Sequence, residues 1–185
     1  MVVICFGEAK YYMAIKRIIK AWKDNSIDEL NLNFLMKPTE LVEYPFSKEI
    51  KMIVQDLKDT ANSIECAGIA ANQISYNKRI FIGLSDPEKK IFKIYINPKI
   101  INANEKYIKQ AYKNESDHWQ GNDRHEHSTE ACLSFPGASM SFPRYDKIQV
   151  EYMDEEGAII IDKLEGFISQ IFQHETDHLD GKTVA

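Results

Sequence analysis

The stretch His174-Glu175-Thr176-Asp177-His178, close to the end of the 185-residue chain, decides the fold prediction. Two histidines four positions apart lie on one face of a helix, where both imidazoles can bind one divalent metal ion. Glu175, between them, would lie beside a water molecule held by that metal. A catalytic site needs a third protein ligand, and little chain follows His178. We therefore expect that ligand to come from upstream, unlike in metalloproteases whose third ligand follows the motif.

A C-terminal helix over residues 167–180 is expected to carry this motif. Phe167, Ile171, His174 and His178 share one face of that helix, so the histidines should point toward the core. Gly181 suits the left-handed position just after a helix.

The rest of the pattern predicts an α+β domain. Helical periodicity is expected over residues 8–23 and again over 47–64, where Ser47 can cap the helix. Residues 79–84 and 91–96 form one predicted hairpin, with Asn97-Pro98 ending its second strand. Residues 149–153 and 158–163 form another, with Gly157 in its turn. We expect one domain over residues 1–185, with an N-terminal extension at 1–40 and a polar surface insertion at 102–129.

Composition excludes several classes of protein. The net charge is −5 and basic residues form no sustained block, so we expect no nucleic acid or membrane partner. A signal peptide and a membrane span are not expected, so the chain should be soluble. Three cysteines, an odd number without paired spacing, favour a reducing compartment over a disulfide framework.

Two upstream segments could complete the site. Cys132 is the best candidate for the third ligand, because a thiolate and two imidazoles leave one position open on a tetrahedral metal. By itself Cys132 is equally well interpreted as a buried core thiol. Residues 68–73 are small and end in Gln73, whose amide can donate to an oxyanion. Without context, an ordinary helix-to-turn connection is the simpler interpretation of this segment.

Taken together and in order, the three segments resemble the peptide deformylase family. That family carries a glycine-rich segment ending in Gln, then Glu-Gly-Cys-Leu-Ser, then Gln-His-Glu-x-Asp-His. Residues 66–73, 130–134 and 173–178 match these motifs. The resemblance covers roughly residues 41–181. It implies antiparallel β-sheets packed around a central, metal-binding C-terminal helix.

The resemblance also implies an activity, which is hydrolysis of the formyl group from the N-terminus of formyl-methionyl polypeptides. The expected metal ligands are Cys132, His174 and His178. The expected catalytic groups are the Glu175 carboxylate, the Gln73 amide and the Leu133 backbone N–H. Substrate is expected to contact Gly68, Ala67 and Ile171, and the site is expected to be supported by Glu130, Arg144 and Asp177.

One divalent metal ion per chain is expected. The family resemblance implies ferrous iron, and zinc, nickel or cobalt also suit two imidazoles and a thiolate. The expected partner is a nascent formyl-methionyl peptide, met at the ribosome. The expected location is the cytoplasm of a bacterial or phage-infected cell, with an organelle as the alternative.

Three departures from the family pattern keep other functions open. Cys66 and Ala131 replace glycines of the family motifs, and Ala67 replaces a larger apolar residue. One alternative is therefore a deformylase-like binding protein that has lost catalysis. Another is a different amidase or peptidase with the His-Glu-x-x-His motif and a third ligand other than Cys132. A second metal site at His118, His125 and His127 is a minor alternative.

Overall fold

The computed structural model describes residues 15–23, 25–104 and 127–182. Its helices are α1 (Glu29–Leu35), α2 (Lys48–Ser63) and α3 (Gly166–Leu179), with a 3-10 turn, η1 (Ala71–Ile74). Its strands are β1 (Trp22–Lys23), β2 (Ser26–Ile27), β3 (Gly68–Ala70), β4 (Ile80–Asp86), β5 (Ile91–Ala103), β6 (His127–Cys132), β7 (Phe135–Pro143), β8 (Lys147–Met153) and β9 (Ile159–Glu165).

A five-stranded antiparallel sheet separates two helices. Its strand order is β3-β4-β5-β8-β9. Side chains alternate along β4, so Ile80 and Ile82 join the apolar cluster that contains α2 residues such as Leu57. Phe81, between them, joins the opposite cluster with Phe172 of α3. Strand β4 is therefore buried on both faces, which explains its isoleucine-rich sequence.

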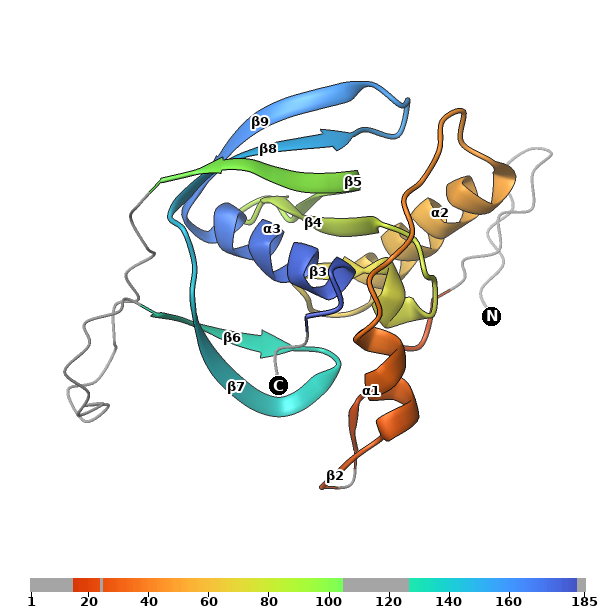
Figure 1. Ribbon diagram of the computed structural model, residues 1–185, viewed down its shortest axis with the longest axis vertical. Helices are drawn as coiled ribbons and strands as arrows, with labels where there is room; N and C mark the ends of the chain where they lie inside the picture. The colour runs from red at the N-terminus through yellow and green to blue at the C-terminus, as the bar shows by residue number, and fades with distance from the viewer. Residues whose placement is uncertain (1–14, 24, 105–126, 183–185) are drawn as a thin grey trace.

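Helix α3 lies at the centre of the molecule. The sheet covers one side of it and the β6–β7 hairpin lies on the other side (Figure 1). The predicted C-terminal helix is thus confirmed, and Gly181 follows it with φ of 72°. A side chain at Gly181 would meet the Met36 carbonyl oxygen, 2.4 Å from an added Cβ. The α+β prediction, with antiparallel sheets around this helix, is confirmed.

Most of the other predicted elements are also present. Ser47 caps α2 by accepting a hydrogen bond from the Ile50 N–H at 3.3 Å. Both hairpins form, β4–β5 and β8–β9, and Gly157 has the left-handed φ of 86°.

Asn97-Pro98 does not end its strand as predicted. Strand β5 continues to Ala103 through a bulge between Ile96 and Lys99, where Asn97 adopts φ of 51°. The bulge lets β5 pair first with β4 and then with β8. The residue pair Asn97-Pro98, which predicts the end of a strand, therefore lies at a bulge within β5.

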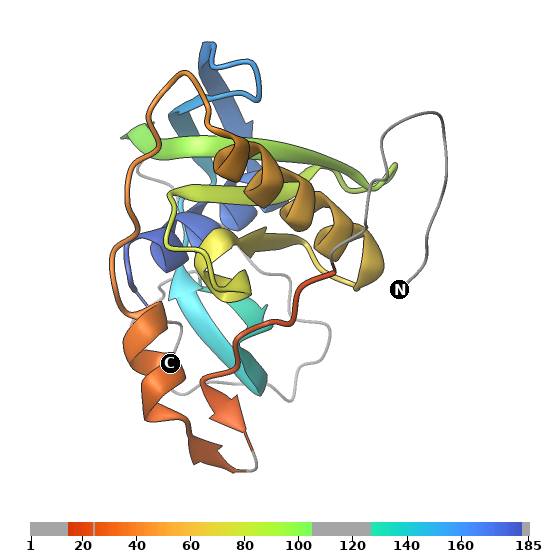
Figure 2. The same cartoon turned by 90° about the vertical axis from the view of Figure 1, so that its right-hand side faces the viewer.

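The prediction of a helix over residues 8–23 is wrong for its described part. Residues 15–21 are neither helix nor strand, and Trp22–Lys23 form β1 (Figure 2). Residues 8–14 lie outside the described residues. A helix instead begins after Asp28, whose carboxylate accepts from the Asn31 N–H at 3.1 Å. Asp28 is therefore the N-cap of α1.

The predicted insertion at residues 102–129 is shorter at its described ends. Strand β5 includes residues 102 and 103, and β6 begins at His127. Residues 105–126, with His118 and His125, lie outside the described residues.

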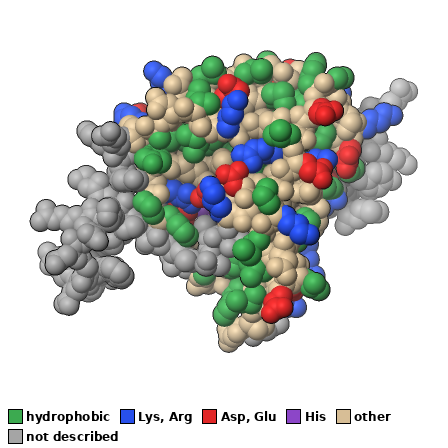
Figure 3. All heavy atoms as spheres, in the orientation of Figure 1, with side chains coloured by type: hydrophobic (Ala, Val, Ile, Leu, Met, Phe, Trp, Pro, Cys, Tyr) green, Lys and Arg blue, Asp and Glu red, His purple; other side chains and the backbone are tan. Residues whose placement is uncertain are grey.

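The described surface shows a mixture of charges. Acidic and basic side chains are interspersed on the face in Figure 3. No helix of the described chain is long and apolar enough to cross a membrane.

Candidate active site

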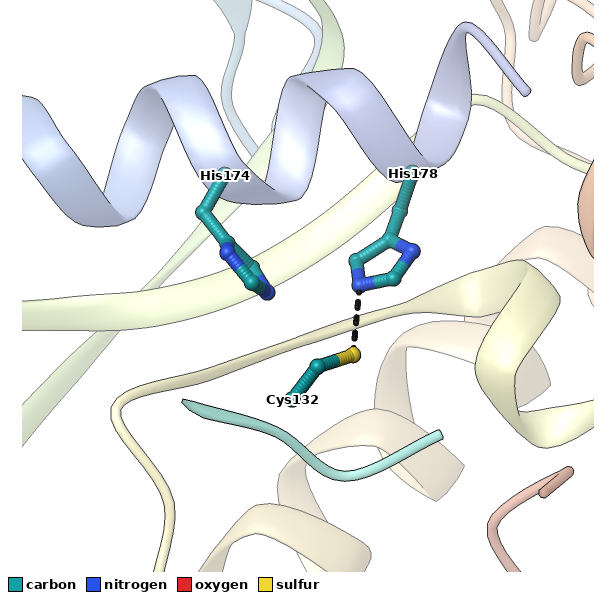
Figure 4. A group of neighbouring side chains, drawn as sticks. All are labelled: Cys132, His174 and His178. Carbon is teal, nitrogen blue, oxygen red and sulfur yellow. Dashed lines mark hydrogen bonds between the residues drawn. The ribbon is translucent and has the colours of Figure 1, made fainter. Parts of the chain in front are cut away.

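Three buried side chains converge between α3 and the β6–β7 hairpin. His174 and His178 project from α3 toward Cys132, at the end of β6 (Figure 4). The Cys132 sulfur lies 3.2 Å from the Nε2 atom of His178. One potential ligand atom from each residue lies within 4.8 Å of the others. The structure thus brings together the three predicted metal ligands.

This donor set fits a divalent metal. Ligands bound at usual metal–nitrogen and metal–sulfur lengths around a tetrahedral centre lie roughly 3.5 Å apart. The sulfur of Cys132 and Nε2 of His178, 3.2 Å apart, lie slightly closer than that, and all three ligand atoms lie within 4.8 Å of one another, so small side-chain shifts would complete the site. The group combines two imidazoles with one thiol, and all three residues are buried. Such a site favours zinc, iron, nickel or cobalt over calcium or magnesium.

Glu130 fixes the orientation of His174. Its Oε2 lies 2.6 Å from His174 Nδ1, so Nδ1 donates the hydrogen bond and Nε2 is left for a metal. Burial opposes ionisation of Glu130, but hydrogen bonds from His174 and Arg144 lower its pKa to about 2. Burial also disfavours the charged His174, yet hydrogen bonds to Cys132 and Glu130 raise its pKa to about 10. These shifts describe the site without its metal.

Arg144 joins the hairpin to the helix. Its guanidinium donates two hydrogen bonds to Glu130, at 2.7 and 2.9 Å, and a third to Asp177 Oδ2. Arg144 and Glu130 are both buried. The three residues predicted to support the site therefore form one ionic network.

Glu175 is enclosed beside strand β3. Its side chain is buried, and its Oε2 atom has no hydrogen-bond partner among the described residues. Burial raises the pKa of Glu175 to about 7. A Cβ added at Gly68 would lie 2.6 Å from Glu175 Oε1, so only glycine leaves room for this carboxylate. The orphaned oxygen marks where a proton-bearing ligand can bind.

Gln73 holds its amide against the ligands. Its Oε1 accepts from the Ala70 N–H at 2.9 Å, which orients Nε2 toward the site. Nε2 lies 3.2 Å from Ser134 Oγ, 3.3 Å from His178 Nε2 and 3.7 Å from the Cys132 sulfur. The Gln73 amide therefore lies beside two of the three candidate metal ligands, Cys132 and His178.

The remaining predicted residues lie around this centre. Leu133 follows Cys132 in the tight turn between β6 and β7. Ile171 is buried, and a Cβ at Gly83 of β4 would come 3.0 Å from its Cγ2. Ala67 is half-buried, and its carbonyl accepts from the Leu84 N–H at 2.8 Å.

Cys66 and Ala131, which replace glycines of the family motifs, do not have positive φ angles. Ala131 lies in strand β6 and is not among the described residues with positive φ, so it carries no left-handed strain. Cys66 is half-buried, and burial with the nearby Glu175 charge raises the pKa of its thiol to about 12.

Two residues of the site had no predicted role. Ser134 is completely buried and contacts Gln73, and Asn72 donates to the His178 carbonyl at 2.7 Å. Both adjoin predicted residues, at positions 133 and 73, but nothing in their spacing predicts these contacts. The partners of Asn72 and Ser134 are far away in sequence, and only the fold brings them together.

Comparison with known proteins gives one consistent result. Residues 25–185 match the model of a family described as polypeptide deformylase. The peptide deformylase of Aquifex aeolicus is 36% identical over 152 residues, which cover 80% of this chain and 78% of that protein. The Elusimicrobium minutum peptide deformylase is 33% identical over 177 residues, or 92% of this chain and 85% of that one. The crystal structure of the Thermotoga maritima enzyme aligns with a TM-score of 0.69 at 24% identity, covering 90% of this chain and 92% of that one.

Proposed function

Because the chain belongs to the polypeptide deformylase family and is a metal-dependent hydrolase of N-formyl-methionyl peptides, we propose how its own residues divide that reaction. The observation that supports the assignment best is the convergence of Cys132, His174 and His178 beside the enclosed carboxylate of Glu175.

Cys132, His174 and His178 would hold the metal. When bound, the metal acts as a Lewis acid that lowers the pKa of water and stabilises developing negative charge. Glu130 keeps His174 in the tautomer that leaves Nε2 for ligation. Arg144 balances the charge of Glu130, so the carboxylate stays ionised inside the protein.

Glu175 carries the proton. Its orphaned Oε2 accepts a proton from the attacking water and then returns it to the nitrogen of the departing amine. A general base works best when its pKa lies near the working pH, and burial already brings the pKa of Glu175 to about 7. The missing side chain at Gly68 leaves the space in which this carboxylate lies.

Two hydrogen-bond donors are proposed to stabilise the oxyanion that forms when water attacks the formyl carbon. The Gln73 Nε2 is aimed at the ligands because Gln73 Oε1 accepts a hydrogen bond from the Ala70 N–H. The Leu133 N–H belongs to the turn that follows Cys132. Donors fixed in advance need no reorganisation when charge develops, which is why they lower the barrier.

The peptide is proposed to bind along strand β3. This strand lies at the edge of the five-stranded sheet, so an extended peptide can pair with it. Its first residue, Gly68, is next to Glu175, which supports the proposal that the end of such a peptide reaches the carboxylate. Ala67 and Ile171 are proposed to contact the substrate side chain.

Metal identity and cellular setting are also proposals. We infer ferrous iron as the native metal, because the ligand set suits it and the family resemblance implies it. The natural substrate is a nascent chain, so the enzyme is proposed to act in the cytoplasm at the ribosome. The relatives reported above come from bacteria, which supports this setting.

The test is formate release from formyl-Met-Ala-Ser by protein purified anaerobically and loaded with ferrous iron. Glu175→Gln should keep one metal per chain and lose activity by more than about a hundredfold, because it removes the proton carrier. The matched control is Glu156→Gln, which changes an exposed carboxylate in the β8–β9 turn and should keep full activity. Undiminished release by Glu175→Gln would overturn this assignment.

The alternative peptidase assignment requires a third ligand other than Cys132. The close approach of the Cys132 sulfur to His178 argues against it. Cys132→Ser should therefore lower both metal affinity and formate release. Intact metal content and activity in that variant would favour the peptidase instead.

A further inference from the structure

The segment formed by residues 16–21, here called the strap, contacts both sequence motifs that build the oxyanion donors. The Ile19 N–H donates to the carbonyl oxygen of Gln73 at 2.8 Å. The Ala21 N–H donates to the carbonyl oxygen of Ser134 at 2.9 Å. Gln73 and Ser134 are 61 residues apart in sequence, and their side chains also meet, Nε2 to Oγ, at 3.2 Å. The strap therefore hydrogen-bonds to the main chain of both Gln73 and Ser134, whose side chains contact each other.

The strap is itself held at both ends. At its start, the Lys16 N–H donates to Thr60 Oγ1 at 3.0 Å and the Lys16 ammonium lies 3.2 Å from Asp56 Oδ2. Both partners are buried on α2. At its end, the Asp28 N–H donates to the Ala21 carbonyl at 2.8 Å. The strap thus runs as a fixed connection from α2, past η1, to the β6–β7 turn.

The element that carries Gln73 needs such a constraint. η1 is a single 3-10 turn, and it ends at Ser75 with the left-handed φ of 75°. Such turns have poorer hydrogen-bond geometry than α-helices and hold their side chains less firmly. The Gln73 side chain is oriented by Ala70, and Asn72 joins η1 to the His178 carbonyl of α3, but the main chain of η1 also needs a link to the Cys132–Ser134 turn. The strap provides that link with two hydrogen bonds.

We propose that Ile19 and Ala21, through their backbone N–H groups, are positioning residues for the oxyanion donors of this enzyme. The strap sets the separation of the Gln73 amide from the β6–β7 turn, so it acts on the transition state more than on substrate binding. This inference rests on the proposed role of Gln73.

The test separates the Ile19 N–H from the Ile19 side chain. Ile19→Pro removes the donor, and Ile19→Ala keeps the donor while removing the apolar side chain. Lys20→Pro is the matched control, because the Lys20 N–H makes no hydrogen bond among the described residues and its side chain is exposed. Ile19→Pro should lower kcat by about tenfold to a hundredfold, the effect of a sub-ångström misplacement, with KM within about twofold. The other two variants should keep kcat within about threefold of the parent enzyme, since both retain the hydrogen bond.

Equal kcat values for Ile19→Pro and Lys20→Pro would overturn the inference, as would a loss confined to KM. Should Ile19→Pro fail to fold, an amide-to-ester replacement at residue 19 removes the same N–H without the proline ring, and the same kcat loss is expected. Gln73→Ala separates the proposed role of Gln73 from the proposed role of the strap. If Gln73→Ala keeps full kcat, the proposed function of Gln73 fails. If it loses kcat while the residue 19 ester does not, the strap inference alone fails.

Discussion

Substituting Gly68 by alanine tests whether the Glu175 carboxylate needs the space that glycine leaves at position 68. The added Cβ would lie 2.6 Å from Glu175 Oε1, well inside the 3.4 Å at which ordinary contact begins. Two further Glu175 atoms, Cγ and Cδ, would both lie at 2.9 Å. The backbone at Gly68 does not have a positive φ, so alanine adds crowding without backbone strain.

The magnitude follows from this shortfall. Glu175 must move by up to about 0.8 Å, and a misplacement of about 1 Å can cost about a hundredfold in rate. We therefore expect kcat/KM to fall by about tenfold to a hundredfold, equivalent to about 1.4–2.7 kcal/mol of lost transition-state stabilisation. Overpacking should also lower the unfolding free energy by about 1–3 kcal/mol. One metal per chain should remain, because no ligand is touched.

The assay is formate release at several peptide concentrations, with metal content and urea unfolding measured on the same sample. The matched variant is Gly83→Ala, whose Cβ would crowd Ile171 Cγ2 at 3.0 Å and leave Glu175 untouched. Gly83→Ala should lower the unfolding free energy by a comparable amount. It should raise KM, because Ile171 is proposed to contact the substrate, and should lower kcat much less than Gly68→Ala does. Wild-type kcat/KM in metal-loaded Gly68→Ala would refute the reasoning.

Three further outcomes are expected. Arg144→Met removes the arginine that pairs with the buried Glu130 charge and should destabilise the protein by about 3–5 kcal/mol in urea unfolding. Lys147→Met breaks an exposed pair with Glu165 and should leave the unfolding midpoint nearly unchanged. Equal effects of the two substitutions would contradict the network. Cys66, with a thiol pKa raised to about 12, should react with iodoacetamide at pH 8 at least about a hundredfold more slowly than a free cysteine, as measured by peptide mapping. Cobalt-loaded protein should show a thiolate-to-cobalt absorption band that Cys132→Ser removes and Cys66→Ser keeps; persistence of the band in the first variant would exclude Cys132 as a ligand.

The sequence predicts elements whose signals are local. The helical period of α2, the cap at Ser47 and the turn at Gly157 each depend on neighbouring residues, and the structure confirms them. The strap lies within residues 8–23, which are predicted to be helical because Tyr11, Ile15, Ile18, Ile19 and Trp22 are spaced for one helix face. Its N–H groups instead bond to Gln73 and Ser134, so long-range contacts override the local preference.

The same distinction applies to the site. The three metal ligands could be predicted because two share one helix and the third lies in a recognisable motif. The contact of Ser134 with Gln73 and the bond of Asn72 to His178 join segments far apart in the chain. Strand ends are also hard to predict from sequence alone. Asn97-Pro98 is typical of a strand end, but the pair lies at a bulge within β5. Such features depend on pairing partners that a single sequence does not identify.

The ionic network of Glu130, Arg144 and Asp177 has a consequence for the supply of metal in the cell. It joins the hairpin that carries one ligand to the helix that carries the other two, with protein atoms alone. These contacts do not depend on the metal, so exchange of one ion for another is expected to need no refolding. Exchange of the ion is then limited by how fast the ion dissociates, so turnover is expected to follow the divalent metal that the surroundings supply.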